Sequence, residues 1–324
     1  MECSVGLASV ESPHRAAVVA CAPTDSPVDG VPAVLTTIAF PAMNVGRSLP
    51  QFLSTVMGEV FDTGPAAALR LVDVTVPEWL PGPRFPPPDD LMLGAILKPS
   101  TALSPEEAGA LAGELAAGGI DVVKDDETMA SPPHSPVVER VRAVRAAAPG
   151  VLYMANVTGP IDSLIERAWA CAHAGANGLM LSWATSGLDA LRWLREAGPP
   201  LPLHAHPNFA AAFTRSARFG VAPEVVARLT AAAGGDQIHC GSVAGRLWGS
   251  RHDVVALFDA VRTAGACPVI AGGEGPHTVP ATAAAVGRAG FLHLCGAGVV
   301  GHPDGPRAGA RALRRAWDSE QRVR

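Results

Sequence analysis

Four consecutive polar residues, Lys124-Asp125-Asp126-Glu127, end an apolar run that is typical of a buried strand. Because side chains alternate along a strand, Lys124 and Asp126 share one face, and Glu127 lies where the strand opens into a loop. Carboxylate oxygens suit Mg²⁺. Burial favours a neutral lysine amine, the form that captures CO2 as a carbamate and so becomes a third oxygen ligand. The motif therefore predicts a Mg²⁺ site of Lys124 (as carbamate), Asp126 and Glu127; the alternative is a lysine merely neutralised by two acids.

The composition limits the classes of function. Of the 324 residues, 48% are hydrophobic, 17% charged and 5% aromatic, which predicts a core of Ala, Val and Leu. A net charge of -5 does not indicate the basic surface by which proteins bind nucleic acid. No apolar run approaches the roughly 18 residues of a membrane span. Acidic Glu2 and Glu11 replace the basic start of a signal peptide, so we expect a cytoplasmic protein. The six cysteines lack zinc-site spacing, and reduced, mostly buried thiols are expected.

A small α+β unit is expected at the start of the chain. Residues 1 to about 30 are rich in Pro, Ser and Ala and are expected to be loosely ordered. The pattern then predicts a strand over Val34–Pro41, a helix over Leu49–Phe61 and a strand over Leu69–Pro77. A proline-rich run over Pro81–Pro88 cannot continue either element and is expected to be a linker. The predicted domains are residues 1–88 and 89–324.

From residue 91 the pattern alternates between strand and helix. The predicted strands are Leu91–Pro99, Asp121–Glu127, Val151–Thr158, Gly178–Ala184, Pro202–Asn208, Gln237–Val243, Pro268–Glu274 and Leu292–Gly298. The predicted helices are Pro105–Ala117, Val137–Ala148, Ser163–Ala174, Asp189–Ala197, Pro223–Ala233, His252–Ala264, Val279–Ala289 and Arg307–Glu320. Eight such units in about 230 residues predict an α/β protein with a (β/α)8 TIM barrel, with a doubly wound sheet as the alternative.

Polar residues collect at the carboxyl ends of these strands, which form the active face of such a barrel. They are Lys98, Lys124, Asp126, Glu127, Asn156, His204, His206, Asn208 and His239, followed by Gly272-Gly273 and Gly296-Ala297-Gly298. The last two loops are where barrels commonly bind phosphate through backbone N–H groups, because glycine permits close approach. A single strand-end histidine is more often structural, but placement of all these residues at one rim predicts a site.

At this point the sequence resembles the ribulose bisphosphate carboxylase (RuBisCO) large-chain superfamily, over nearly the whole barrel and part of the small domain. The matching segments are Gly94-Ala95-Ile96-Leu97-Lys98-Pro99, Val123-Lys124-Asp125-Asp126-Glu127, Leu203-His204-Ala205-His206, Gly235-Asp236-Gln237-Ile238-His239-Cys240-Gly241, Pro268-Val269-Ile270-Ala271-Gly272-Gly273 and Cys295-Gly296-Ala297-Gly298-Val299-Val300-Gly301-His302-Pro303. The small-domain segment Val56-Met57-Gly58-Glu59-Val60-Phe61 resembles the element that reaches into a neighbouring subunit's site.

The resemblance implies roles for individual residues. Lys98 would handle protons during enolisation, Lys124 would be the carbamylated ligand, and His206 and His239 would be catalytic or would hydrogen-bond the substrate. The remaining matched or rim residues would bind substrate or phosphate: Glu59, Asn156, Arg246, Gly272, Gly273, Gly296 and Ala297. The cofactors implied are Mg²⁺ and the CO2 of the carbamate.

Several positions depart from the carboxylase pattern. Ser100 replaces a second lysine, Pro207 replaces the arginine for a second phosphate, and Ala210 replaces a further histidine. Ala271 and Ala297 replace a serine and a glycine, Arg246 replaces the lysine that orients CO2, and Glu59 replaces an asparagine. The small domain also resembles a truncated N-terminal domain. These departures imply a RuBisCO-like protein that has lost CO2 addition but kept the metal centre and one phosphate loop.

The implied function is Mg²⁺-dependent enolisation or isomerisation of a phosphorylated keto-sugar-like substrate, for example a diketo or methylthio sugar phosphate of methionine salvage. One alternative is decarboxylation of an oxo-sugar-acid phosphate on the same metal site. A second is a metal-free aldolase that uses Lys98 or Lys124 as a Schiff base. A third is a non-catalytic barrel that binds a metabolite. The expected partners are a small phosphorylated molecule and a second subunit in a homodimer, without nucleic acid or membrane.

Overall fold

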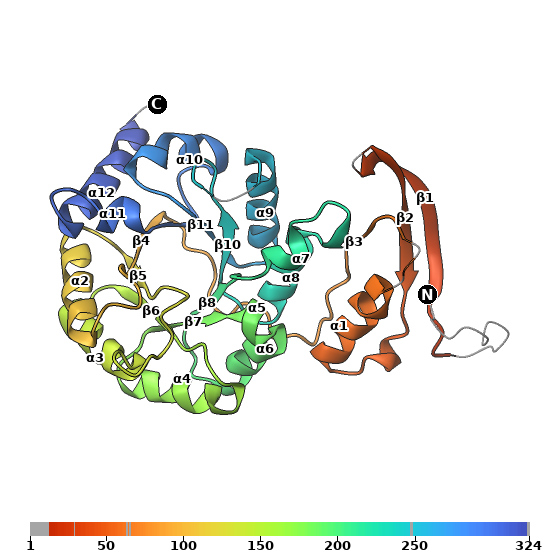
Figure 1. Ribbon diagram of the computed structural model, residues 1–324, viewed down its shortest axis with the longest axis horizontal. Coiled ribbons are helices and arrows are strands. Elements are labelled where there is room, and N and C mark those ends of the chain that lie inside the picture. The colour runs from red at the N-terminus through yellow and green to blue at the C-terminus, as the bar shows by residue number, and fades with distance from the viewer. Residues whose placement is uncertain (1–12, 29, 63, 65, 247–248, 323–324) are drawn as a thin grey trace. The chain divides into compact units, whose positions relative to one another are not determined.

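Eight parallel strands close into a barrel, with the order β10-β11-β12-β4-β5-β6-β7-β8 (Figure 1). They are β4 (Met92–Ile96), β5 (Val122–Lys124), β6 (Leu152–Asn156), β7 (Gly178–Ser182), β8 (Leu203–His206), β10 (Gln237–Gly241), β11 (Cys267–Ala271) and β12 (Leu292–Cys295). Each lies inside a predicted strand, apart from β11, which begins one residue earlier. The (β/α)8 barrel is therefore confirmed and the doubly wound sheet is wrong, because an open sheet would leave two strands with a free edge.

Helices surround the barrel in Figure 1. The principal ones are α2 (Pro105–Ala117), α3 (Val137–Ala147), α4 (Leu164–His173), α6 (Leu188–Ala197), α8 (Pro223–Ala232), α9 (Arg251–Thr263), α10 (Val279–Val286) and α12 (Pro306–Arg322). Local sequence explains where two of them begin. Ser104 and Glu107 form a capping box at α2, and Ser250 and Asp253 form another at α9, so each pair satisfies backbone N–H groups that a helix start leaves free.

Alternation along the strands fills the barrel interior. The buried interior side chains are Val122, Met154, Met180, Cys267, Val269, Ala271, Leu292 and Leu294, with Met92, Ile96 and Leu152 packed against them. These positions share one parity on each strand, as the pleat requires. The same parity continues to Lys124, Asn156, Ser182 and His206 at the strand ends, and it therefore turns those side chains toward the mouth of the barrel.

Short elements interrupt the regular alternation of strand and helix. They are η3 (Ile161–Ser163), α5 (Trp183–Ser186), α7 (Ala211–Thr214), β9 (Phe219–Val221), η4 (Pro276–Thr278) and α11 (Ala297–Val300). The sequence patterns used above predicted none of them, because three or four residues are too few to show a period.

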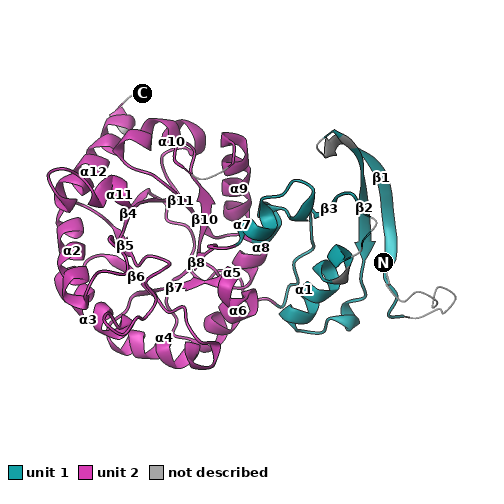
Figure 2. Ribbon diagram, viewed as in Figure 1, with its two compact units in different colours: residues 1–79, 210–226 teal, residues 80–209, 227–324 magenta. Residues whose placement is uncertain are grey.

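The chain divides into two compact units, coloured separately in Figure 2: residues 1–79 with 210–226, and residues 80–209 with 227–324. This computed structural model describes residues 13–28, 30–62, 64, 66–246 and 249–322. Within these residues no helix is both long and apolar enough to cross a membrane. The proline-rich run has no regular structure, and the backbone N–H groups of Arg84 and Phe85 donate to Asp236 Oδ1 (2.7 and 3.0 Å).

The smaller unit contains a two-stranded antiparallel sheet that corrects one expectation. Strand β1 (Ala17–Val28) pairs with β2 (Val31–Ala39), although we expected residues up to about 30 to be loosely ordered. Residues 1–12 of that expectation lie outside the described residues. Pro23 and Pro27 lack the N–H groups that pair strands, which is why no strand was expected here. An edge strand tolerates proline where no hydrogen bond to a neighbouring strand is needed. Short helices η1 (Ala42–Asn44), α1 (Leu49–Met57) and η2 (Glu59–Asp62) follow, so the single helix predicted over Leu49–Phe61 is divided.

A second correction concerns the strand predicted over Leu69–Pro77. Only β3 (Leu69–Leu71) forms, and its parallel partner is β9, about 150 residues later in the sequence. The Arg70 guanidinium adds bonds to the backbone oxygens of Ser216 and Thr214 beside β9. The pairing depends on a distant segment, so local periodicity could not indicate where the strand ends.

Candidate active site at the barrel mouth

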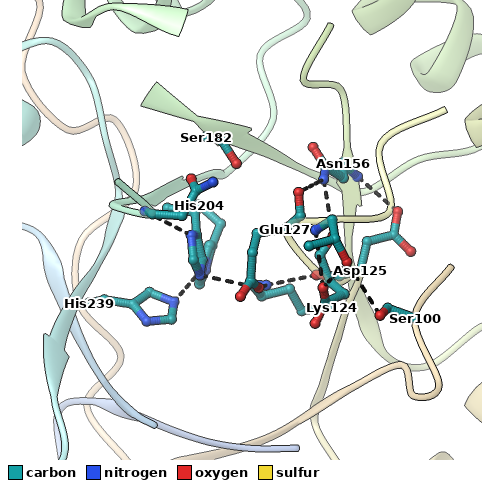
Figure 3. A network of polar contacts seen from close by, with 12 residues as sticks. Ser100, Lys124, Asp125, Glu127, Asn156, Ser182, His204 and His239 are labelled. Carbon is teal, nitrogen blue, oxygen red and sulfur yellow. Dashed lines mark hydrogen bonds and ion pairs between the residues drawn. The ribbon is translucent and has the colours of Figure 1, made fainter. Parts of the chain in front are cut away.

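The predicted metal, lysine, histidine and phosphate-loop residues of the barrel lie at the carboxyl ends of its strands. In Figure 3, Lys124 and Glu127 lie between His204 and His239 on one side and Asp125 and Asn156 on the other. Parallel strands of one closed barrel bring residues about 170 positions apart to a single rim, so the fold itself accounts for this convergence.

Lys124 is the fully buried centre of the site. Its Nζ donates to the backbone oxygen of Asp125 (2.7 Å) and lies 3.7 Å from Glu127 Oε2. Burial lowers the pKa of the Lys124 amine, and the carboxylates of Glu127 and Asp126 offset only part of that effect. The neutral amine is the reactive form toward CO2 or a carbonyl carbon, so the surroundings favour a reactive lysine.

Lys98 forms an ion pair with Asp126. The Asp126 side chain is buried, and its Oδ1 accepts hydrogen bonds from the Thr128 hydroxyl (2.5 Å) and backbone N–H (3.0 Å). Burial would raise the pKa of Asp126, but the bonds from Lys98 and Thr128 outweigh it and leave that pKa below its ordinary value. Ser100 lies beside this group, with its hydroxyl oxygen 3.3 Å from Thr128 Oγ1.

Asp125, between the predicted ligands, points away from them. Its carboxylate pairs with the buried Arg140 of α3 (2.8 Å) and accepts from the Tyr153 hydroxyl (2.7 Å) and the Asn156 N–H (2.9 Å). Arg140 also donates to the backbone oxygens of Met129 (3.0 Å) and of other residues in the same loop. The sequence motif did not indicate this role, although alternation along the strand separates Asp125 from Lys124.

Asn156 uses both ends of its amide within the protein. Its Nδ2 donates to the backbone oxygens of Asp126 (3.0 Å) and Glu127 (3.4 Å), and its Oδ1 accepts from the Thr158 N–H (3.0 Å). The side chain therefore holds the loop that carries the two carboxylates. Direct contact between Asn156 and a substrate stays a prediction.

Three histidines lie together on β8 and β10. His204 Nδ1 bonds to Gln237 Oε1 (2.9 Å), and His204 Nε2 bonds to His239 Nε2 (2.8 Å). His206 Nδ1 accepts from the Asn208 N–H (3.2 Å), and its Nε2 lies 3.5 Å from Glu127 Oε2. Burial, with a smaller effect of Lys124, lowers the pKa of His204 to about 3.

These contacts define which ring nitrogens carry protons. With Gln237 Oε1 as acceptor, His204 carries its proton on Nδ1 and accepts at Nε2 from His239 Nε2–H. His239 Nδ1 is then the nitrogen with a free lone pair. His206 accepts at Nδ1, so its neutral ring carries the proton on Nε2, on the side of Glu127. Burial holds the pKa of both His206 and His239 well below the ordinary value, so both rings are neutral.

The predicted phosphate loops follow β11 and β12. Gly272 and Gly273 have φ values of +120° and +97°, which favour glycine, and Gly272 O accepts from the Arg246 N–H (2.9 Å). A Cβ built on Gly296 would lie 3.9 Å from Lys98 Cε, so this glycine faces the lysine. Ala297 begins helix α11 directly after Gly296.

Glu59 is the predicted contact that the structure does not place. It begins η2 in the smaller unit, and its side chain lies outside the described part of the molecule. Two further polar atoms at the rim, Ser182 Oγ and Asn208 Oδ1, are buried and have no hydrogen-bond partner among the described residues.

The donor set fits a hard divalent cation if Lys124 carries a carboxylate. Asp126 and Glu127 each present an oxygen to a lysine nitrogen, a charge arrangement that a cation can replace. The described residues contain no group of three or more His, Cys, Asp or Glu side chains arranged to hold a metal. Asp126 can join such a site only when Lys98 releases it.

Comparison with known proteins identifies the family. The profile described as "Ribulose bisphosphate carboxylase large chain, catalytic domain" matches residues 82–266 and 262–323, and the profile of the corresponding N-terminal domain matches residues 14–80. Among curated proteins, the chain is 35% identical over 300 residues to the ribulose bisphosphate carboxylase of Pyrococcus horikoshii, covering 84% of this chain and 70% of that one. A solved structure of the Pyrococcus enzyme is described as octameric.

Two relatives are not described as carboxylases. The 3-oxo-isoapionate-4-phosphate decarboxylase of Rhizobium etli is 31% identical over 314 residues, covering 87% of this chain and 74% of that protein. The crystal structure of a RuBisCO-like protein from Burkholderia fungorum superposes with a TM-score of 0.85 at 29% identity, covering 95% of this chain and 87% of the other. This chain is about as similar in sequence to the carboxylases as to the other members, so sequence identity alone does not assign it to either group.

Proposed function

Because the chain belongs to the ribulose bisphosphate carboxylase large-chain family, as a RuBisCO-like protein, we propose that it enolises or isomerises a phosphorylated keto-sugar-like compound with Mg²⁺ and does not fix CO2. The observation that carries this proposal is the fully buried Lys124, with a lowered pKa, beside the carboxylates of Glu127 and Asp126. Lys124 as a carbamate, Asp126 and Glu127 would hold the cation. When bound, Mg²⁺ would stabilise the negative charge that develops on a substrate oxygen as a neighbouring proton leaves.

The residues around the metal site would move the proton. His206 presents Nε2–H and is arranged to donate, whereas His239 Nδ1 has a lone pair that can accept. The Lys98 ammonium, which donates to Asp126, could accept a proton only after losing one. Lys98 would have to release Asp126 before it could act as a base. Its Cε would lie 3.9 Å from a Cβ on Gly296, so this lysine adjoins the proposed phosphate loop.

The departures from the carboxylase pattern support loss of CO2 addition. Ser100 binds Thr128 in place of presenting a second ammonium group, and Pro207 has no side-chain donor for a second phosphate. Arg246 stands where the carboxylase has the lysine that orients CO2, and a guanidinium group has the planar geometry that suits phosphate. It would serve as a clamp for the single phosphate held by Gly272, Gly273 and Gly296.

Decarboxylation is the second candidate, and the Rhizobium etli relative favours it. Loss of CO2 from an oxo-sugar-acid phosphate leaves the same kind of negative charge beside a carbonyl group as proton loss does. The two reactions need the same charge stabilisation and differ in the group that leaves.

Deuterium exchange into candidate keto-sugar phosphates, with Mg²⁺ and bicarbonate present, tests the proposal. We expect deuterium to exchange into one carbon of the substrate, as measured by mass spectrometry. This exchange should be lost with EDTA and in the Lys124→Ala variant. Lys98→Met is the matched variant, since it removes a lysine of the same rim without removing a metal ligand; because it also frees Asp126, slowed exchange with Mg²⁺ affinity equal to or above that of the wild type is expected. Release of CO2 from an oxo-acid phosphate without exchange would support the decarboxylase, and exchange that survives EDTA would contradict both.

We also propose a homo-oligomer, in agreement with the assembly described for the Pyrococcus relative. Large apolar side chains on the two-stranded sheet are exposed, among them Val18 (63%), Val19 (64%), Val34 (60%) and Leu35 (54%). Exposed apolar surface of this kind is commonly covered by another chain.

A further inference from the structure

Glu274, directly after the two glycines of the first proposed phosphate loop, has a fully buried carboxylate. It accepts hydrogen bonds from the hydroxyls of Ser242 and Thr278 and from His293 Nε2 (3.0 Å). The three donors come from the loop after β10, from η4 and from β12. A single carboxylate therefore joins segments that span about 50 residues of sequence.

The protonation of this group follows from its neighbours. The Trp317 indole N–H of α12 donates to His293 Nδ1 (2.9 Å), so that nitrogen carries no proton and His293 holds its proton on Nε2, toward Glu274. Burial would raise the pKa of Glu274, but the bonds from His293, Ser242 and Thr278 outweigh it and leave the pKa below its ordinary value. Glu274 is thus an ionised acceptor that faces three donors.

The same network reaches the backbone of both loops. Ser242 Oγ accepts from the Gly245 N–H (2.6 Å), and Arg246 N–H donates to Gly272 O (2.9 Å). Thr278 Oγ1 accepts from the Gly275 N–H (3.1 Å). The side chain of His293 belongs to the parity of β12 that faces the helices, so the network supports the loops from the outside of the barrel.

We propose that Glu274 is a positioning residue that fixes the loops after β10 and β11, and with them the backbone N–H groups and Arg246 of the phosphate site. The identity of the ligand rests on the proposed function; the fixing of the loops does not. The role requires that both carboxylate oxygens of Glu274 accept hydrogen bonds, because Ser242, Thr278 and His293 all donate. Glutamine at this position would place its NH2 group, a donor, opposite other donors: either Thr278 and His293, or Ser242. His293 cannot move its proton from Nε2 to Nδ1 to accept that bond, because Nδ1 already accepts from Trp317.

The test compares Glu274→Gln with Asp236→Asn. Asp236 is a matched buried carboxylate at the opposite end of the barrel, where it pairs with Arg195 and accepts from the Leu203 N–H (2.7 Å). Amide hydrogen exchange is measured for residues 241–246 and 272–278, and binding of inorganic phosphate is measured by calorimetry at constant ionic strength. We expect at least tenfold faster exchange in both segments and at least tenfold weaker phosphate binding in Glu274→Gln only.

Each outcome decides the proposal. Unchanged exchange in Glu274→Gln would overturn it, and faster exchange with wild-type phosphate affinity would show that Glu274 has only a structural role. If the unaltered protein fails to bind phosphate, the phosphate site of the proposed function is wrong, and the exchange rates alone then decide whether Glu274 fixes the loops. Ser242→Ala is the milder variant if Glu274→Gln does not fold; it keeps the other two donors and should loosen residues 241–246 alone.

Discussion

The adjacent acidic residues Asp125 and Asp126 of the central motif point in opposite directions. Asp126 and Glu127 face the mouth of the barrel with Lys124, whereas Asp125 is bound to Arg140 and Tyr153 on the other side of the strand. The pair of Asp125 and Arg140 is fully buried, so its two charges depend on each other. Asp125 therefore anchors the chain next to Lys124, outside the proposed metal site.

Replacing Asp125 by asparagine should strongly destabilise the barrel. The change leaves the Arg140 guanidinium buried without a counter-charge, which costs about 3–5 kcal/mol of the free energy of unfolding. Urea unfolding at pH 7 measures this. The control is Glu139→Gln, which breaks an exposed pair with Arg142 and should cost less than about 1 kcal/mol. Equal effects of the two substitutions would contradict the role assigned to Asp125.

His204 makes stability depend on pH. Its folded pKa of about 3 lies below the unfolded value of 6.5, so the unfolded chain binds a proton that the folded chain does not. Above pH 6.5 His204 is neutral in both the folded and the unfolded chain, so it does not change the free energy of unfolding. Between pH 6.5 and about 3 this residue should lower the free energy of unfolding by about 1.4 kcal/mol per pH unit. Urea unfolding at pH 7.5, 5.5 and 4.5 should show a smaller slope in His204→Gln; an unchanged slope would refute this assignment.

At the scale of elements, the loops after β10, β11 and β12 pack backbone against backbone. Gly298 lies against the backbone oxygen of Glu274, and Gly245 lies against Gly272 O, so neither position has room for a Cβ. Such packing brings the backbones of three loops close together at one rim, and side chains would prevent it. The strands set the direction of these loops, and the glycines set how closely they approach.

Gly273→Ala should therefore weaken phosphate binding beyond its cost in backbone strain. The φ of +97° makes alanine unfavourable, and its Cβ would lie 3.1 Å from the Arg246 nitrogen and push that residue away. Gly287→Ala is the matched control, since φ is +87° and nothing lies within 4 Å. Both should lose roughly 1–3 kcal/mol of stability. Inorganic phosphate, titrated by calorimetry, should bind more weakly only to the Gly273 variant; equal affinities would argue against a phosphate site there.

At the scale of the whole molecule, the structure consists of a barrel that carries the proposed chemistry and a smaller unit whose sheet exposes apolar side chains. An isolated two-stranded sheet is marginally stable in water. Association with another chain would cover it and would account for the valine and leucine side chains on its surface.

Sedimentation velocity at micromolar concentration should show a dimer or a larger assembly. Val19→Lys or Val34→Lys should increase the monomer fraction, because each places a charge among exposed apolar side chains that association would bury. Thr37→Lys, on the same sheet and also exposed, should have a smaller effect. A wild-type chain that sediments only as a monomer would refute the proposed assembly.

The sequence by itself determined the barrel, because its eight strands and helices are each set by local periodicity, and strand alternation alone turned Lys124 and Asp126 to one face. Tertiary structure decided what depends on distant partners. It placed Arg140 behind Asp125, made Lys98 the partner of Asp126, paired β3 with β9 and gathered Ser242, His293 and Trp317 around Glu274. Such contacts join residues up to about 150 positions apart, and a local pattern carries no information on which distant group will supply a hydrogen bond or a charge.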